Sequence, residues 1–318
     1  MMLDSIKNIL LPYLDKKIVT SMIMGFVSGL PLLLTITLLQ AWLTDENVSK
    51  STIGLFALIG LPYSLKFLWA PIFDRYILSN LGRRRGWLLI IQIFLIISIF
   101  ALGQSSPEVN LFNVALLSLV LTFFSASQDI LIDAFRRESL MDKEQTIGAS
   151  AYVLGYRIGA LAAGAGGLIL ADIYSYAFVY TLMSLIMLLG VVTTLLSNEP
   201  NVEIKPYTLK ESIIEPFKEF FGRHTEGNNN IKNYTPYLIL LFVLLYKVGD
   251  TMAHSLSTNF YLEIGFSKTE IGTVVKFFGL GATLLGAFIG GALSLKIGLF
   301  KSLIYFGIFQ LIATLGFS

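Results

Sequence analysis

The chain contains no cysteine and few charged residues. Among its 318 residues, Asp, Glu, Lys and Arg together make up only 14%, whereas 55% are hydrophobic. The absence of cysteine excludes disulfides, thiolate metal sites and thiol catalysis. The scarcity of charge, with a mean hydropathy of +0.72, excludes an ordinary soluble domain. We therefore expect an integral membrane protein.

Other absences narrow the function classes. The sequence has no glycine-rich P-loop and no nucleotide-binding domain, so ATP-driven transport is not supported. It has only two histidines, and no metal site is indicated. We expect no cofactor, no metal, no nucleic-acid partner and no enzymatic activity, and the oligomeric state stays open.

Long apolar runs are abundant. A membrane-spanning helix needs about 20 apolar residues to cross ~30 Å of hydrocarbon. Eight segments meet this length, and a ninth reaches the end of the sequence: 18–43, 52–72, 87–104, 110–132, 147–171, 174–196, 237–262, 271–294 and 301–318. None shows the alternation of roughly ten residues that is typical of a membrane β-barrel strand. The sequence thus predicts an all-α, multi-pass membrane protein in contact with the lipid bilayer.

The basic residues are distributed unevenly between the two sides of these segments. With the N-terminus in the cytoplasm, seventeen Lys and Arg fall in inner segments, whereas only Lys50 and Lys268 fall in outer loops. Basic residues are enriched in cytoplasmic loops of membrane proteins. This bias predicts a cytoplasmic N-terminus.

One long polar segment, residues 197–236, divides the chain. We expect an N-terminal six-helix bundle at 1–196, a cytoplasmic linker at 197–236 and an incomplete C-terminal bundle at 237–318. SKSTIG at Ser49–Gly54 recurs as SKTEIG at Ser267–Gly272, which indicates duplicated bundles. By this repeat, about nine helices of an expected twelve are present. The linker either lets two bundles move as separate bodies or is a passive tether.

Several motifs resemble one transporter family. They are GFVSGLPLLLT (25–35), IGLPYSLKFLWAPIFDR (59–75), LGRRRGWLL (81–89), SASQDILIDAFR (125–136), VLGYRIGALAAG (153–164) and LLYKVGD (244–250). Together they resemble the AmpG-type muropeptide permeases of the major facilitator superfamily, which are related to acetyl-CoA transporters. The resemblance implies a twelve-helix permease of the cell inner membrane that imports N-acetylglucosaminyl-anhydro-muramic peptides by proton symport.

The missing C-terminal quarter leaves alternatives to that function. The substrate can instead be acetyl-CoA or another anionic metabolite. A third possibility is a non-transporting truncated remnant or a membrane-embedded sensor.

Asp74, Arg75, Arg83 and Arg84 resemble the signature loop of the superfamily between helices two and three. Carboxylate and guanidinium groups there can form charge-assisted pairs that hold helix ends together in one state, as a gate. The same arginines also serve as a topology signal. Both interpretations apply.

Helix four carries Ser125, Gln128, Asp129 and Asp133 on one face, at i, i+3, i+4 and i+8. Because a lipid-facing carboxylate costs ~2.5–3.5 kcal/mol, this face should look into the bundle or an aqueous cavity. We expect Gln128 to touch substrate and Asp129 to bind and release a proton. Asp133, nearer the cytoplasm, can simply pair with an arginine of the same helix.

Arg157 lies near mid-bilayer in helix five, beside Tyr152 and Tyr156. Such an arginine either pairs with a carboxylate such as Asp129 or binds a substrate carboxylate. The tyrosines either stack on sugar rings or pack between helices.

Helix seven carries a second polar stripe, Lys247, Asp250, His254 and Thr258. This stripe has either a substrate or coupling role or forms an internal pair that lowers the cost of insertion. Lys66 is expected to extend toward a helix end and the membrane surface.

Small residues recur every fourth position in helix five, at Gly155, Gly159, Ala163 and Gly167, and in helix eight, at Ala282, Gly286 and Gly290. Such ridges let two membrane helices approach closely. The family resemblance implies that helices five and eight meet between the two halves. The ridges either form a sliding seam there or pack statically.

Overall fold

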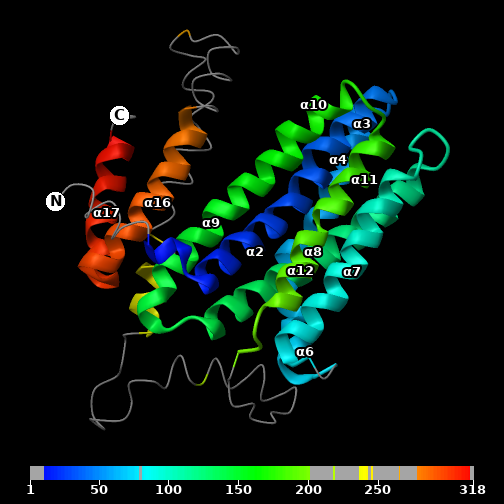
Figure 1. Ribbon diagram of the computed structural model, residues 1–318. Helices are drawn as coiled ribbons and strands as arrows, with labels where there is room; N and C mark the ends of the chain where they lie inside the picture. The colour runs from blue at the N-terminus through cyan, green and yellow to red at the C-terminus, as the bar shows by residue number, and fades with distance from the viewer. Residues whose placement is uncertain are drawn as a thin grey trace. The chain divides into compact units, whose positions relative to one another are not determined.

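The computed structural model of the protein is shown in Figure 1. The structure describes residues 11–78, 81–200, 218, 236–242, 245, 265 and 278–315. The chain forms two compact units, Met1–Pro206 and Tyr207–Ser318. Each is described by itself below. The division lies within the segment expected to be a linker, and the three-part domain scheme stays a prediction.

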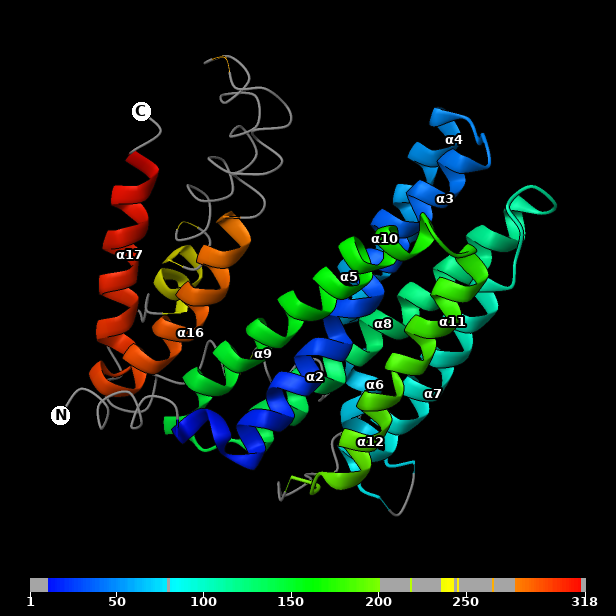
Figure 2. The same cartoon turned by 45° about the horizontal axis from the view of Figure 1, so that its top comes forward.

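The first unit is a bundle of long helices that lie alongside one another (Figures 1 and 2). Its elements are α2 (Lys16–Leu33), η2 (Leu34–Leu38), α3 (Leu39–Asp45), α4 (Lys50–Leu55), η3 (Phe56–Gly60), α5 (Leu61–Leu65), η4 (Lys66–Leu68), α6 (Ala70–Arg75), α7 (Arg83–Gly103), α8 (Leu111–Ser139), η5 (Asp142–Glu144), α9 (Gln145–Leu161), η6 (Ala162–Gly166), α10 (Gly167–Ala171), α11 (Tyr176–Ile186) and α12 (Leu188–Leu196). Within the described residues, six helical stretches are long and apolar enough to cross a membrane.

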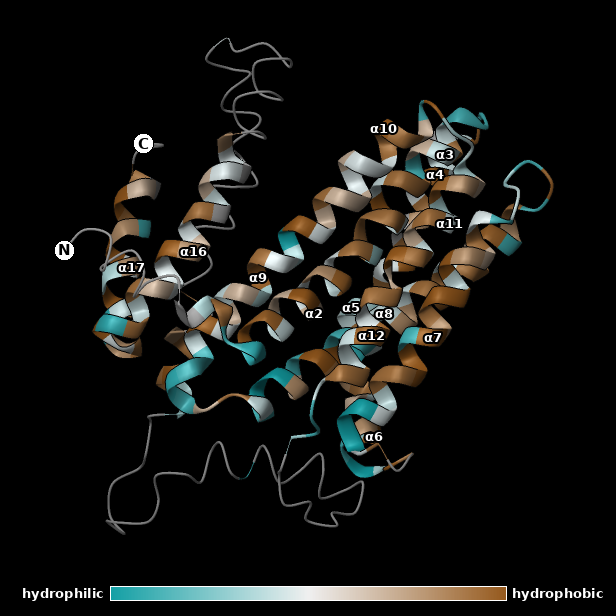
Figure 3. Cartoon of the chain, in the orientation of Figure 1, coloured by the Kyte–Doolittle hydropathy of each residue, from teal (hydrophilic) through white to brown (hydrophobic). Residues whose placement is uncertain are grey.

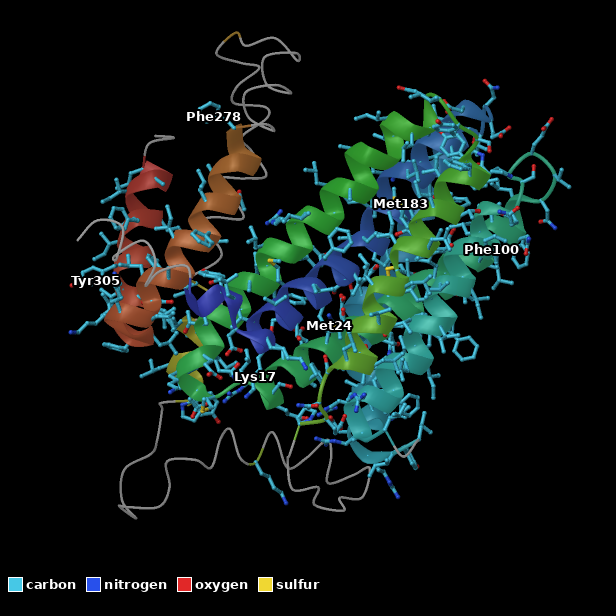
Figure 4. The ribbon with its side chains drawn as sticks, in the orientation of Figure 1. Lys17, Met24, Phe100, Met183, Phe278 and Tyr305 are labelled. Carbon is cyan, nitrogen blue, oxygen red and sulfur yellow. The ribbon has the colours of Figure 1, made fainter. Side chains whose placement is uncertain are left out.

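We call the end of this bundle where α2 begins and α8 ends the Arg84 end, and the opposite end the Asp45 end. Figure 3 shows hydrophobic residues along the helices and hydrophilic ones gathered near α6, at the Arg84 end. Figure 4 labels two residues of α2: Lys17, at the Arg84 end, and Met24, which is buried in the bundle. The distribution fits helices with apolar middles and polar ends.

The first span is interrupted by a proline. Pro31 has no N–H, so the carbonyl of Val27, four residues earlier, lacks its helical donor. Nε2 of Gln128, on α8, donates to that carbonyl at 3.1 Å. The helix then widens into the π-helical turn Leu34–Leu38 before α3 begins. A buried amide of a neighbouring helix thus satisfies the backbone group that proline frees.

The second span is not one continuous α-helix. It alternates α-helical and 3-10 turns from α4 to α6, and Pro62 and Pro71 stand in the first turns of α5 and α6. Proline is tolerated there because the N–H groups in the first turn of a helix have no acceptor within the helix, so a missing N–H loses no hydrogen bond. As a result Lys66 begins a short 3-10 turn, η4, between two helical pieces.

The core of the first unit is formed by hydrophobic side chains, most of them from the first span (α2, η2 and α3), α7 and α8. Tyr180 of α11 is fully buried in it, and its hydroxyl donates to the carbonyl of Leu34 at 2.9 Å. Gln92 of α7 is also fully buried and accepts from the hydroxyl of Thr194 at 2.9 Å. The first bond ties α11 to the span that Pro31 interrupts, and the second ties α12 to α7.

Helices α2 and α9 lie side by side (Figures 1 and 2) and approach through four glycines. A Cβ on Gly25 or Gly29 would overlap the backbone carbonyl of Tyr152 or Tyr156. In return, a Cβ on Gly155 or Gly159 would overlap the carbonyls of Met22 and Phe26. Each helix therefore uses glycine where the backbone of the other passes.

This packing corrects one expectation. Gly155 and Gly159 were expected to face helix eight of the second half, but they are occupied by α2 of their own bundle. The reason is that α2 carries a matching Gly-x-x-x-Gly pair, Gly25 and Gly29, one helical turn apart. Two such ridges interlock most closely with each other.

In the second unit the structure describes α16 (Gly279–Ile297) and α17 (Leu299–Leu315). Gly298 joins them with a φ of 80°, a left-handed conformation that glycine adopts without strain. A Cβ built on Gly290 would lie 3.8 Å from the ring of Phe306, and no described atom lies within 4 Å of a Cβ built on Gly286. The partner of this ridge stays a prediction.

Candidate functional site

A polar cluster occupies the interior of the first bundle. It joins Ser28 of α2, Lys66 of η4, Asp129 of α8 and Tyr152 of α9, and we call it the Asp129 cluster. Its members come from four different spans. Asp129 lies ten residues before the end of α8, which is about 15 Å along the helix axis. The cluster therefore lies deep in the bundle, far from its end. Charge costs most at this depth.

Asp129 is held by one hydroxyl and one ammonium group. The hydroxyl of Ser28 donates to Oδ1. Nζ of Lys66 lies 3.7 Å from Oδ2, which is a loose ion pair. The Asp129 side chain is 13% exposed and that of Lys66 35% exposed. The carboxylate thus lies behind a lysine that still reaches open space.

A short hydrogen-bond chain leads away from the carboxylate. Oγ of Ser28 lies 2.9 Å from the hydroxyl oxygen of Tyr152. Because Ser28 gives its only hydroxyl proton to Asp129, Tyr152 must donate to Ser28. If Asp129 gains a proton, every bond of this chain can reverse its direction without any movement of heavy atoms. The arrangement is suited to a group that changes its protonation state.

Two further bonds fix the second span against α8. The hydroxyl of Tyr63 donates to Oγ of Ser125 at 2.9 Å, and Nε1 of Trp69 donates to Oγ of Ser127 at 3.0 Å. Tyr63 and Trp69 flank Lys66 by three residues on either side. These bonds therefore place Lys66 opposite Asp129 although its own turn is not α-helical.

Gln128, expected to touch substrate, is fully buried. Its Nε2 holds the carbonyl of Val27, and its Oε1 has no hydrogen-bond partner within the described residues. A contact between Gln128 and substrate would require this bond to rearrange. In the present arrangement the residue is a structural link between α8 and α2.

Arg157 was expected to be the nearest partner of Asp129, and this is wrong. Lys66 takes that place, and Arg157 is exposed and forms no ion pair with any described residue. The physical reason is helix geometry. Arg157 is five residues after Tyr152, which places it about 140° around α9 from the side that reaches Ser28. The expectation that Lys66 extends toward the membrane surface is corrected at the same time.

Three other expected residues are placed clearly. The rings of Tyr152 and Tyr156 have centroids 6.2 Å apart and are both half-buried, so Tyr156 packs against the tyrosine that belongs to the Asp129 cluster. Asp133 pairs with Arg136 of its own helix at 3.5 Å, as the structural interpretation expected. Lys247, Asp250, His254 and Thr258 lie outside the described residues.

A second charged group lies at the Arg84 end. It comprises Asp74 of α6, Arg83 and Arg84 of α7, Glu138 of α8 and Glu199 after α12, and we call it the Arg84 cluster. Arg84 is only 4% exposed. Its guanidinium lies 2.7 Å from Oδ1 of Asp74 and donates to both oxygens of Glu138, and Arg83 also reaches Glu138 at 2.9 Å.

Glu199 completes this cluster by capping α7. Its two oxygens accept from the backbone N–H groups of Arg84 at 2.7 Å and of Arg85 at 3.0 Å. An anion at a helix N-terminus satisfies free donors and complements the helix dipole. Gly82 precedes the helix with a φ of 103°, and a Cβ there would collide with the Glu199 side chain.

The predicted signature-loop residues are therefore brought together with one exception. Asp74, Arg83 and Arg84 form charge-assisted contacts between helix ends, as expected. Arg75 instead stacks over Tyr76, 5.3 Å from the ring centroid. The sequence interpretation missed Glu138 and Glu199. Their only signal was an acidic residue at the end of a span, on the side where arginines gather.

A cavity of about 430 Å³ also opens at the Arg84 end. Its lining includes Lys16, Lys17, Glu138 and Glu199, and no member of the Asp129 cluster. The two polar regions are thus separate sites of the first unit.

With this geometry established, the comparisons with known proteins decide the family. The sequence matches the Major Facilitator Superfamily over residues 21–318. The chain belongs to this superfamily. The expected class, an all-α membrane protein of the Major Facilitator Superfamily, is confirmed.

Several relatives are permeases or transporters by name. The chain is 45% identical over 292 residues to the anhydromuropeptide permease of Escherichia coli (strain K12), which covers 91% of this chain and 57% of the relative. It is 34% identical over 307 residues to the putative transporter AmpG 4 of Rickettsia felis, covering 93% and 72%. The similarity to AmpG-type permeases is thus confirmed. The chain spans little more than half the length of the Escherichia coli relative.

Proposed function

We propose that this protein is a secondary active transporter of the inner membrane that imports anhydro-muropeptides, driven by a proton gradient. The observation that carries the proposal is the Asp129 cluster. It gathers a carboxylate, an ammonium group and two hydroxyls from four spans into the bundle of a chain that is similar to an anhydromuropeptide permease.

The chemistry of the cluster supports proton coupling at Asp129. An ionised Asp129 attracts Lys66 and orients the hydroxyls of Ser28 and Tyr152. A protonated Asp129 releases Lys66 and leaves no bare carboxylate in a medium of low dielectric constant. The bundle can then rearrange with less electrostatic cost. Proton binding would thereby change which state of the transporter is favoured.

The Arg84 cluster supports a gate at the bundle end. It links the ends of α6, α7 and α8 through a buried arginine, and Glu199 adds the end of α12. Such a set of bonds has two discrete arrangements, formed and broken. We assign it the role of stabilising one of the two transport states.

Uptake into vesicles tests the function. Vesicles that contain the protein are loaded at high internal pH, and labelled anhydro-muropeptide or labelled acetyl-CoA is added outside at lower pH. We expect the muropeptide to accumulate above its external concentration, and an ionophore that collapses the pH gradient should abolish this. Accumulation of acetyl-CoA instead would change the substrate class, and accumulation of neither would contradict transport.

Accessibility labelling tests the proposed orientation. We expect a reagent that does not cross the membrane to reach Lys50 and Lys268 from outside intact cells. Lys218, replaced by cysteine in this cysteine-free chain, should react only after the membrane is opened. One position on the wrong side would overturn the cytoplasmic N-terminus.

A further inference from the structure

Lys66 combines two properties that are not found together elsewhere in the Asp129 cluster. It is the cation of the cluster, and its side chain remains 35% exposed although its partner is only 13% exposed. Because an ammonium group facing hydrocarbon would be costly, we infer that the Lys66 ammonium borders an aqueous or polar space. A solute in that space would meet Lys66 before Asp129.

The pair between Lys66 and Asp129 is also weak enough to be exchanged. Nζ and Oδ2 are 3.7 Å apart, which is beyond the range of a strong charge-assisted hydrogen bond. Asp129 has a second ligand, the hydroxyl of Ser28, and so does not depend on Lys66 alone. A lysine ammonium has three donors on a flexible stem and can turn toward another anion.

From these observations, we propose that Lys66 binds a carboxylate of the substrate. To do so, its ammonium group gives up the ion pair with Asp129. The inference rests on the proposed function and adds the group that recognises the anionic part of the substrate. A peptide substrate carries carboxylates. The bonds of Tyr63 and Trp69 to α8 fix the turn that carries Lys66, and its flexible side chain can bring the ammonium group to one of these carboxylates. Substrate binding and the ionic state of Asp129 are then linked, because both anions compete for one ammonium group.

Other cations near the cluster fit this role less well. The guanidinium of Arg136 lies 5.6 Å from the ring centroid of Tyr152 and is already paired with Asp133. Arg157 is exposed, but it lies on the side of α9 away from Ser28, so its occupation by an anion has no direct effect on Asp129. Arg157 is therefore the matched comparison for Lys66.

The first experiment compares a muropeptide with its amide. Binding of the free-acid form and of an analogue with amidated carboxylates is measured by isothermal titration calorimetry to the protein in detergent. A hydrogen bond to a charged group corresponds to a preference of about 10- to 100-fold for the acid. Lys66→Gln should remove this preference and leave the affinity for the amide unchanged, which also shows that the variant is folded. Lys66→Arg should keep most of it.

Arg157→Gln serves as the control. It should retain the preference for the acid, because Arg157 is not the receptor in this account. If Arg157→Gln loses the preference and Lys66→Gln keeps it, Lys66 is not the receptor and the proposal is wrong. If neither variant changes the preference, the proposal is also wrong.

Competition makes a second test that a structural role cannot imitate. Removing the competing anion with Asp129→Asn should strengthen binding of the acid by about two- to fivefold, the range expected for a partly exposed ion pair. Lys66→Gln should weaken it. A merely structural pair would give weaker binding for both variants.

The result also separates this inference from the proposed function. If the wild-type protein binds the muropeptide but Lys66→Gln keeps its preference for the acid, the function stands and the receptor assignment fails. If the wild-type protein binds neither the acid nor the amide, the proposed function fails and the inference falls with it.

Discussion

The Asp129 cluster and the Arg84 cluster are both built from carboxylates and basic groups, but they hold their charges differently. Arg84 is 4% exposed and is bound by two carboxylates, with Nη1 2.7 Å from Asp74 and Nε at 3.0 and 3.1 Å from the oxygens of Glu138. Lys66 has one carboxylate partner among the described residues, at 3.7 Å, and remains 35% exposed.

This difference indicates which charges the bundle needs for its fold and which it can use for function. A buried guanidinium with several partners is costly to remove, because the carboxylates around it lose their countercharge. A single long pair at a partly exposed site contributes little to stability. The loosely held pair is therefore the one that can change partners during transport. Four predictions test this division, from the largest effect to the smallest.

Replacing Arg84 should have the largest effect on stability. Arg84→Ala leaves Asp74 and Glu138 without their main cation, and we expect the free energy of unfolding to fall by about 3–5 kcal/mol. Thermal unfolding in detergent measures it. Arg75→Ala is the matched control, because Arg75 only stacks on Tyr76, and its loss should change stability by less than about 1 kcal/mol. Equal effects would remove the contrast between buried and exposed arginines.

A methyl group added at the α2–α9 contact should have the second-largest effect on stability. Gly155→Ala places a Cβ against the carbonyl of Met22, which is backbone and cannot turn aside. We expect a loss of about 1–3 kcal/mol in the free energy of unfolding from overpacking. Gly286→Ala meets no described atom within 4 Å and should be nearly neutral. A neutral Gly155→Ala would show that α2 and α9 do not hold Ser28 and Tyr152 together through these glycines.

Replacing Gln128, the neighbour of Asp129 on α8, should have the third-largest effect on stability. Gln128→Ala leaves the carbonyl of Val27 without a donor, and the expected loss is about 1–2 kcal/mol. Gln104→Ala is the control. It removes an exposed amide just after the end of α7, and the free energy of unfolding should fall much less. If Gln128→Ala does not change stability but abolishes muropeptide binding, the earlier expectation of a substrate contact is restored.

Lys66 should give the smallest change. Lys66→Gln breaks a pair that we expect to contribute no more than about 1 kcal/mol to stability. The same thermal measurement, made beside Arg84→Ala, shows the ratio of the two effects. A loss as large as that of Arg84 would mean that the Lys66–Asp129 pair is a structural support.

The sequence predicted the helices of the first unit well because their signal is local. Each apolar run is long enough by itself to identify a span, and the structure has helices at all six places. Asp129 was also found from the sequence, because a carboxylate within an apolar run has a cost that demands a reason. The charge pairs of the signature loop followed from the closeness of Asp74 and Arg84 in sequence.

The partners of these residues were harder to predict, because periodicity identifies a helix face but not the helix that it meets. Ser28 and Asp129 are 101 residues apart, and Arg84 and Glu138 are 54 apart. Lys66 was assigned to the membrane surface because its partner lies on another span, whereas the bonds of Tyr63 and Trp69 to α8 place it opposite Asp129. The spacing of Gly25 and Gly29 was a signal for the α2–α9 contact that was not used.

The central claim is that Asp129 couples transport to the proton gradient, and one pair of assays on Asp129→Asn tests it most directly. In vesicles, exchange of labelled for unlabelled anhydro-muropeptide needs only binding and movement between states, whereas accumulation against a concentration difference also needs coupling. We predict that Asp129→Asn retains exchange at a rate within about tenfold of the wild-type protein and loses accumulation driven by a pH gradient. Normal accumulation by Asp129→Asn would contradict the account.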